Sequence, residues 1–138
     1  MYHAYIAVVC TNPELSSVRD SDKMLSIVAS KSKRAEEGRE PVNQMLLINR
    51  FDPERAASDE MLQLADIQEL LGLNLIGVVP ESKAVLTATN LGQPVISIDG
   101  EDAAGAFEDT VARFLGEDRP MRFTTPKEKS WFDGLFGK

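Results

Sequence analysis

Three residues near the middle of the chain have side chains suited to holding a purine base. Asn49 can pair with the N6 and N7 edge of adenine, as asparagine does in groove recognition, and Arg50 offers a flat guanidinium that can stack. Pro80 offers a rigid apolar wall. Polar residues are also common in ordinary loops that leave strands. These residues therefore have two interpretations, a purine site and a solvated loop.

A second group of residues is acidic and lies in a segment with helical spacing. At about 100° per residue, Asp22 borders the apolar stripe of this segment, whereas Asp20 points away from it. The stripe consists of Leu15, Val18, Leu25 and Val28. Arg19, three residues before Asp22, is placed for a local ion pair. The alternative interpretation is that these acidic residues belong to a surface that binds a partner or a second subunit.

The end of the chain, residues 127–138, combines aromatic and basic residues. On a helical projection, its apolar side chains fall within an arc of about 140°, and they are Trp131, Phe132, Leu135 and Phe136. Lysines flank them at Lys127, Lys129 and Lys138. Such a segment can lie in a membrane interface, or it can dock on its own domain or on a sister chain. Its small apolar area predicts weak, reversible binding.

Composition and charge exclude several classes of function for the 138 residues. With one cysteine, Cys10, and one histidine, His3, the chain can form no intramolecular disulfide, zinc cage or Cys/His nucleophilic centre. Residues 1–118 carry 10 basic and 20 acidic residues (net −10), whereas residues 119–138 carry 5 and 2 (net +3). An acidic body of this kind argues against nucleic-acid binding, and the cysteine content fits a reducing compartment.

Strands and helices are predicted to alternate along the chain. Short apolar runs predict strands at residues 4–10, 45–48 and 75–79, and the first is nearly continuous, as in a strand buried on both faces. A helix is predicted to follow the cap-type residues 11–14 and to run to about Gly38, and further helices are predicted over residues 64–71, 83–90 and 102–115. This order is typical of a parallel α/β sheet with right-handed crossovers.

The predicted sheet would bring three loops together. Ligands of parallel sheets bind at the carboxyl ends of the strands, and the loops over residues 11–14, 49–53 and 80–82 leave those ends. The first of these loops is also explained by helix capping alone, because Thr11, Asn12, Pro13 and Glu14 are typical of a helix start.

Several segments, in this order, resemble the MinD/ParA family of ATPases, and within it the C-terminal half of the septum-site-determining members. They are TNPELSSVRDSD (11–22), ASKS (29–32), LIGVVPE (75–81), GQPVI (92–96) and the 131–136 tail. The resemblance implies the C-terminal half of a P-loop NTPase fold, with a partial three-layer parallel sheet, helices on both faces and a C-terminal amphipathic helix. It divides the chain into an ATPase half-domain (1–118), a linker (119–126) and a membrane-targeting segment (127–138).

The resemblance also implies ligands for the predicted loops. The family binds ATP or ADP with Mg²⁺, so Asn49 and Arg50 together with Pro80 and Glu81 would form the adenine end of the nucleotide pocket. Glu14 would lie near the nucleotide across a homodimer.

Partners and location follow from the same resemblance. Ser16, Asp20 and Asp22 would lie on the face that binds the division inhibitor MinC and the activator MinE. Phe132, Leu135 and Phe136 would insert into anionic lipid of the inner membrane, with Trp131, Lys127 and Lys129 beside them. The family implies a cytoplasmic protein held peripherally on that membrane, and no nucleic-acid partner.

One departure from the family is large. None of the nine glycines opens a G-x-x-x-x-G-K-[ST] loop, which supplies the phosphate cradle and the hydroxyl for Mg²⁺. We therefore expect a truncated homologue that has no catalytic residues and does not hydrolyse ATP alone. An alternative is a non-enzymatic module that binds membrane and Min partners. For the truncated homologue, loss of the strands that flank residues 4–10 in the family would expose a sheet edge and apolar faces, so we expect the chain to be marginally stable or to aggregate.

Overall fold

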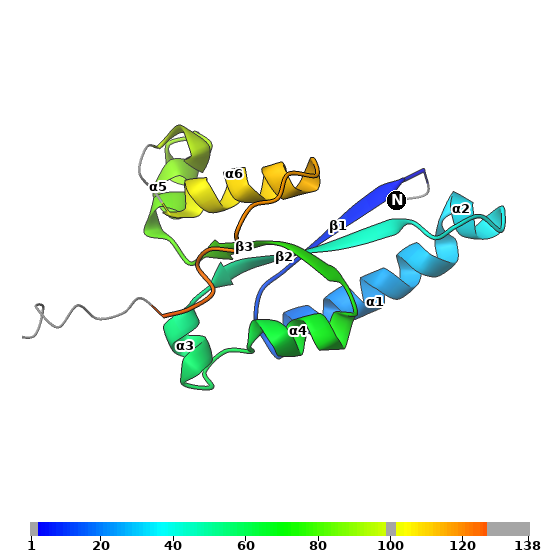
Figure 1. Ribbon diagram of the computed structural model, residues 1–138, viewed down its shortest axis with the longest axis horizontal. Coiled ribbons are helices and arrows are strands. Elements are labelled where there is room, and N and C mark those ends of the chain that lie inside the picture. Colours follow the sequence, from blue (N-terminus) through cyan, green and yellow to red (C-terminus); the bar gives the residue numbers. More distant parts are fainter. Residues whose placement is uncertain (1–2, 99–101, 127–138) are drawn as a thin grey trace, which may run out of the picture.

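The computed structural model describes residues 3–98 and 102–126, which form a layered α/β unit (Figure 1). The elements in chain order are β1 (Ile6–Thr11), α1 (Leu15–Lys31), α2 (Lys33–Glu36), β2 (Asn43–Phe51), α3 (Pro53–Ala57), α4 (Leu64–Leu71), β3 (Asn74–Pro80), α5 (Lys83–Asn90), the 3-10 turn η1 (Val95–Ser97) and α6 (Asp102–Phe114). Strands and helices alternate as predicted. Among the described residues, no helix is both long and apolar enough to cross a membrane.

The three strands form one parallel sheet in the order β1–β2–β3. Ile6 lies opposite Asn43 at the start of the first pair, and Thr11 lies opposite Ile48 near its end. Helices α1 and α4 lie on one side of the sheet and α5 and α6 on the other (Figure 1). The predicted parallel α/β sheet with helices on both faces is therefore confirmed.

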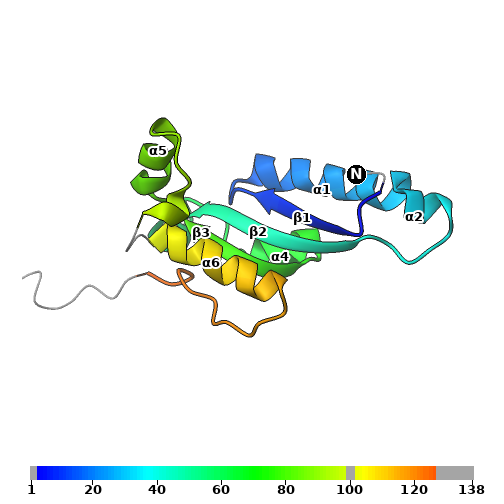
Figure 2. The same cartoon turned by 90° about the horizontal axis from the view of Figure 1, so that it is seen from above.

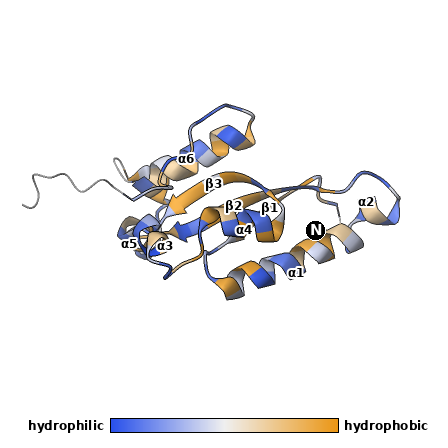
Figure 3. Cartoon of the chain, turned by 60° about the horizontal axis from the view of Figure 1, so that its bottom comes forward, coloured by the Kyte–Doolittle hydropathy of each residue, from blue (hydrophilic) through white to orange (hydrophobic). Residues whose placement is uncertain are grey.

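Alternate strand residues serve two separate cores. Leu46 and Ile48 are fully buried on the side of α1 and α4, and Val78 joins them there. The next residues along, Leu47 and Val79, face the α6 side and contact the alanines of that helix. Figure 3 shows hydrophobic residues concentrated along β2 and β3, whereas α1 and α6 carry both hydrophobic and hydrophilic residues. This period-two division is the pattern of a sheet covered on both faces.

The prediction that the first strand is buried on both faces is wrong. Ile6 and Val8 are each 44% exposed and Cys10 is exposed, while Val9 packs on the α1 side. The cause is the position of α6, which packs on β3 and lies away from β1 (Figure 2). No helix of the described residues covers this face of β1. Strand order also places β1 at one edge of the described sheet, where the sequence predicted an open edge.

The first helix also differs from the prediction. It ends at Lys31 instead of continuing to Gly38, because the buried side chain of Ser32 accepts a hydrogen bond from the Ala35 N–H (3.2 Å) and starts the separate helix α2. Leu15 is 46% exposed although it was assigned to the buried stripe. It lies roughly 90° from the centre of the stripe formed by Val18, Leu25 and Val28.

Close packing of α6 on β3 depends on Gly77. A Cβ atom at this position would meet the Thr110 side chain and would lie 2.8 Å from Cδ1 of Leu47. The Thr110 hydroxyl donates to the Ala106 carbonyl (2.7 Å), which fixes it against the strand. Gly77 therefore sets the distance between sheet and helix on this face.

Candidate functional site

The carboxyl ends of β2 and β3 are joined directly. The Glu81 N–H, just after β3, donates to the Phe51 carbonyl at the end of β2 (3.0 Å). The loop after β1 is tied to the same region, because the Pro13 carbonyl accepts from the Leu62 N–H (3.0 Å). The three predicted segments therefore lie at the same end of the sheet. Only part of them is loop, because residues 49–51 continue β2 and Pro80 is the last residue of β3.

A charged cluster occupies this edge. Arg50 donates through Nη2 to Oε1 of Glu81 (2.9 Å), and Arg55 lies 3.7 Å from the other carboxylate oxygen. The hydrogen bond to Glu81 and the charge of Glu81 are the main causes that raise the pKa of Arg50; desolvation lowers it, and the charge of Glu14 adds a smaller increase. Arg50, Glu81 and Glu14 are thus electrostatically coupled, whereas half-buried Asn49 lies within β2.

A cavity of about 420 Å³ opens beside this cluster. It is lined by Phe51, Asp52, Pro53, Glu54, Pro80, Glu81, Asp102, Phe123, Thr125 and Pro126. Two of the predicted residues, Pro80 and Glu81, are in this set, and Asn49, Arg50 and Glu14 are not. The cavity has two aromatic rings and three prolines as apolar walls, and four carboxylates as acceptors.

The chemistry of these walls favours one part of a nucleotide over the other. Flat apolar side chains and hydrogen-bond acceptors suit an aromatic ring that carries an amino group. Four carboxylates disfavour a phosphate by charge repulsion. Within the described residues, no group of three or more His, Cys, Asp or Glu side chains could hold a metal ion. The described residues therefore fit a base and do not fit the triphosphate with its Mg²⁺.

One wall of the cavity is formed by the start of α3, a helix that was not predicted from the sequence. Asp52 caps α3, since its Oδ1 accepts from the N–H groups of Glu54 (2.9 Å) and Arg55 (3.2 Å). Pro53 follows at the first helical position. Asp52 followed by Pro53 is typical of a helix start and indicates this short helix, whereas the sequence predicted a loop here.

The remaining wall comes from residues 119–126, which we call the strap. The sequence predicted a linker here, and the structure places these residues against the domain (Figure 1). Met121 packs on the core of the α1 side, and Phe123 packs on the core of the α6 side. The strap therefore passes around the outer edge of β3.

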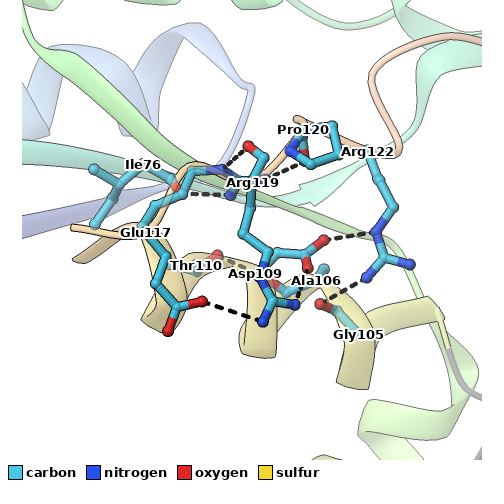
Figure 4. Close-up of polar contacts among 10 residues, drawn as sticks. Ile76, Gly105, Ala106, Asp109, Thr110, Glu117, Arg119, Pro120 and Arg122 are labelled. Carbon is cyan, nitrogen blue, oxygen red and sulfur yellow. Dashed lines mark hydrogen bonds and ion pairs between the residues drawn. The ribbon is translucent and has the colours of Figure 1, made fainter. Parts of the chain in front are cut away.

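An ionic network fastens the strap to α6 (Figure 4). Asp109, whose side chain is 7% exposed, accepts from Nε of Arg122 (2.6 Å) and lies 3.6 Å from Nη1 of Arg119. Arg122 also donates to the Gly105 carbonyl (3.1 Å). The Asp109 hydrogen bond is the main cause that raises the pKa of Arg122. Sequence alone gave no sign of this network, because its partners lie 13 and 10 positions apart in the chain.

Arg113 adds a second fastening. Its guanidinium donates to the Ile76 carbonyl on β3 (2.8 Å), and to the carbonyls of Arg119 (2.9 Å) and Pro120 (2.5 Å). One side chain thus joins α6, β3 and the start of the strap.

The predicted partner residues are all on the surface of α1. Ser16 and Asp20 are exposed and share a face, being four residues apart, and Asp22 is exposed beside the buried stripe. Within the described residues, the ion pair at this position joins Lys23 to Asp20 (2.8 Å), and not Arg19 to Asp22. The predicted membrane residues Lys127, Lys129, Trp131, Phe132, Leu135 and Phe136 lie outside the described residues.

Comparison with known proteins places this geometry in context. No protein-family model matches the chain. The septum site-determining protein MinD of Escherichia coli strain K12 is 49% identical over 137 residues, which is 99% of this chain and 51% of that protein. This chain is similar to MinD. It spans about half the length of the curated MinD relatives that it matches.

Solved structures of MinD have the same fold. MinD of Aquifex aeolicus matches with a TM-score of 0.75 and 28% identity, over 88% of this chain and 48% of that one. The Aquifex aeolicus MinC:MinD complex matches with a TM-score of 0.74 and 28% identity, over 86% of this chain and 46% of that one. The resemblance to MinD and the α/β fold predicted from the sequence are both confirmed.

Proposed function

We propose that this chain performs the membrane-binding and partner-binding part of MinD-like septum-site determination. The observation that carries the proposal is the 49% identity to MinD, which extends over 99% of the chain. It includes the strand ends, the acidic helix α1 and the tail. In this proposal the chain is cytoplasmic and binds the inner membrane peripherally.

The nucleotide part of the proposal concerns the base. Pro80 and Glu81 line the cavity, and Arg50 holds Glu81 in place through their 2.9 Å hydrogen bond. Asn49 would reach the base from β2, and Glu14 would approach the nucleotide across a homodimer. ATP or ADP with Mg²⁺ is the ligand that the likeness to MinD supports, and the phosphates and the metal would be held by residues other than those described.

The membrane part of the proposal concerns residues 127–138. Trp131, Phe132, Leu135 and Phe136 would lie at headgroup depth, and Lys127 and Lys129 would meet anionic lipid. The +3 charge of residues 119–138, against −10 for the rest of the chain, supports this orientation.

The partner part of the proposal concerns α1. Ser16, Asp20 and Asp22 are exposed side chains on a well-packed helix, so they can contact MinC without rearrangement of the core. A MinC:MinD complex among the similar structures supports MinC as the partner. MinE would compete for the same face.

Vesicle sedimentation tests the membrane part. The full chain and a variant ending at residue 126 are each mixed with vesicles of phosphatidylglycerol and phosphatidylethanolamine, and with neutral phosphatidylcholine vesicles. We expect the full chain to pellet with the anionic vesicles and the shortened variant to stay in solution. Equal pelleting of both forms contradicts a role for residues 127–138.

A second candidate function is a binding module that works without nucleotide. The four carboxylates around the cavity, and the lack of a G-x-x-x-x-G-K-[ST] motif in the 138 residues, favour it for this polypeptide alone. Added ATP and Mg²⁺ separate the two candidates. Vesicle binding that rises with ATP supports the nucleotide-dependent function, and binding that is unchanged supports the module.

A further inference from the structure

We propose that the strap forms one wall of the base site, so that a purine bound at the β2 and β3 ends contacts Phe123 and Thr125. The strap is residues 119–126, and the cavity of about 420 Å³ includes three of its members. The inference rests on the proposed nucleotide function and adds residues to it that lie outside the predicted loops. A bound purine would stabilise the position of the strap, and contacts with the strap would increase the affinity for the base.

The position of the wall is fixed from outside the cavity. Asp109 binds Arg122 (2.6 Å), the residue before Phe123, and Arg122 also donates to the Gly105 carbonyl. The Arg122 guanidinium lies 5.1 Å from the centre of the Phe123 ring, within the range of a cation–π contact. These contacts order the wall before any ligand arrives, which lowers the entropy cost of binding.

The backbone at Phe123 turns the strap toward the cavity. Its φ is +63°, in the left-handed region that residues other than glycine rarely adopt. Packing of the ring against Val79 and Ala103 holds this conformation. Such strain persists where the surrounding structure determines it, often at a ligand site.

The two threonines that follow face different spaces. Thr125 lines the base cavity together with Pro80 and Glu81. Thr124 lines a neighbouring cavity of about 330 Å³ between α3 and α4, together with Ala57 and Leu64. Thr124 and Thr125 are therefore a matched pair for substitution: Thr125 belongs to the proposed wall, and Thr124 does not.

The test is a titration of the full ¹⁵N-labelled chain with adenosine, followed by NMR of the backbone amides. Ribose serves as the matched probe without a base. We expect adenosine, and not ribose, to shift the amides of Phe51 and Glu81 and also those of Phe123 and Thr125. Shifts at Phe51 and Glu81 with none in the strap overturn this inference and leave the base site intact. No shift at any of these amides contradicts the base site itself, and the strap wall falls with it.

Two substitutions measure the contribution of the wall. Thr125→Ala removes a hydroxyl and a methyl group from the cavity, and we expect about a 2- to 10-fold weaker affinity for adenosine. Thr124→Ala removes the same atoms from the neighbouring cavity, and we expect unchanged affinity. Both variants are compared with the parent chain by circular dichroism, and Thr125 is exposed, so its substitution leaves the core intact. Equal affinities for the two variants overturn the inference.

Discussion

At the scale of single residues, Asp109 is the buried polar group that joins α6 to the strap. It is a buried carboxylate on α6 whose partners Arg119 and Arg122 both belong to the strap, and each partner is about half exposed. A buried charge that loses its partners is costly, because the lost hydrogen bonds are not replaced by water. The attachment of the strap therefore depends on this carboxylate more than on any surface ion pair.

We expect Asp109→Asn to lower the free energy of unfolding by about 1.5–3 kcal/mol, the range for hydrogen bonds to charged groups. Glu117→Gln is the matched control, since Glu117 pairs with Arg119 (3.2 Å) at an exposed position and should change stability by less than about 0.5 kcal/mol. Urea denaturation followed by circular dichroism measures both. Similar losses for the two variants would show that burial of Asp109 has no special role.

Gly77 gives a second prediction at this scale. Gly77→Ala would push a Cβ atom into the Thr110 side chain, and such overpacking costs about 1–3 kcal/mol. Thr110→Ala removes the Thr110 atoms that clash and leaves the close contact with Leu47, so the double variant should lose less stability than the sum of the two single variants. A thermodynamic cycle from urea denaturation checks this coupling. Additive losses would show that α6 approaches β3 less closely than the structure has it.

At the scale of elements, the two edges of the sheet differ. Arg113 and the strap cover the outer side of β3, whereas β1 has exposed Ile6 and Val8 and, among residues 3–98 and 102–126, no strand paired to its outer side. An uncovered strand edge with apolar side chains is a site for pairing with another chain. Association through β1 should therefore dominate over association through β3.

We expect Val8→Lys to reduce association of the chain, because a charged side chain on an edge strand opposes pairing. Sedimentation velocity at increasing protein concentration measures the effect. Thr87→Lys on α5 adds the same charge at an exposed site away from the edge and should leave association unchanged. Equal effects of the two lysines would point to net charge instead of the β1 edge.

Cys10 gives an independent readout of the same edge. The thiol is exposed on β1, although partial burial by its neighbours raises its pKa. Less thiolate is then present at pH 8 than in free cysteine, so Ellman's reagent should react more slowly than with free cysteine, and faster as pH rises. Reaction should slow further in the associated chain and recover with Val8→Lys. Reactivity that is independent of concentration would contradict pairing at β1.

The elements also show how far sequence reasoning reaches. The strands β2 and β3 and the helix α4 were predictable because apolar runs and a glycine stop determine them locally, with Gly72 at φ +62°. The exposure of β1 was not predictable from its composition, since it depends on where α6 packs. The end of α1 was not predicted correctly, because the Ser32 side chain caps the next helix, α2, and α1 stops before it. The strap was missed because Asp109, Arg119 and Arg122 meet only in three dimensions.

Part of the candidate site was also predictable from the sequence, and part of it was not. Pro80 follows from the strand order, since parallel strands bring their carboxyl ends together, and Glu81 follows from the family resemblance. Phe123 and Thr125 line the cavity, and the backbone bends at Phe123 with a left-handed φ that no local pattern indicated. Strand order and family resemblance predicted one side of the cavity, whereas the opposite wall is formed by tertiary structure alone.

At the scale of the whole molecule, the features proposed for function lie on separate parts of the domain. The base cavity lies at the ends of β2 and β3, the acidic residues lie on α1, and the strap leads from the cavity toward residue 127. This arrangement would allow a partner on α1 and a membrane at the tail to be engaged at the same time. A link between MinC and the membrane is what the function proposed above requires of this chain.

That link is tested most directly by sedimentation of purified MinC with anionic vesicles in the presence of this chain. We expect MinC to pellet when the full chain is added, and to remain in solution with the variant that ends at residue 126 or with Asp20→Lys. Thr87→Lys, which places the same charge on α5, should still bring MinC to the vesicles. MinC that stays in solution while the full chain pellets would contradict the proposed role, as would MinC that pellets equally with every variant.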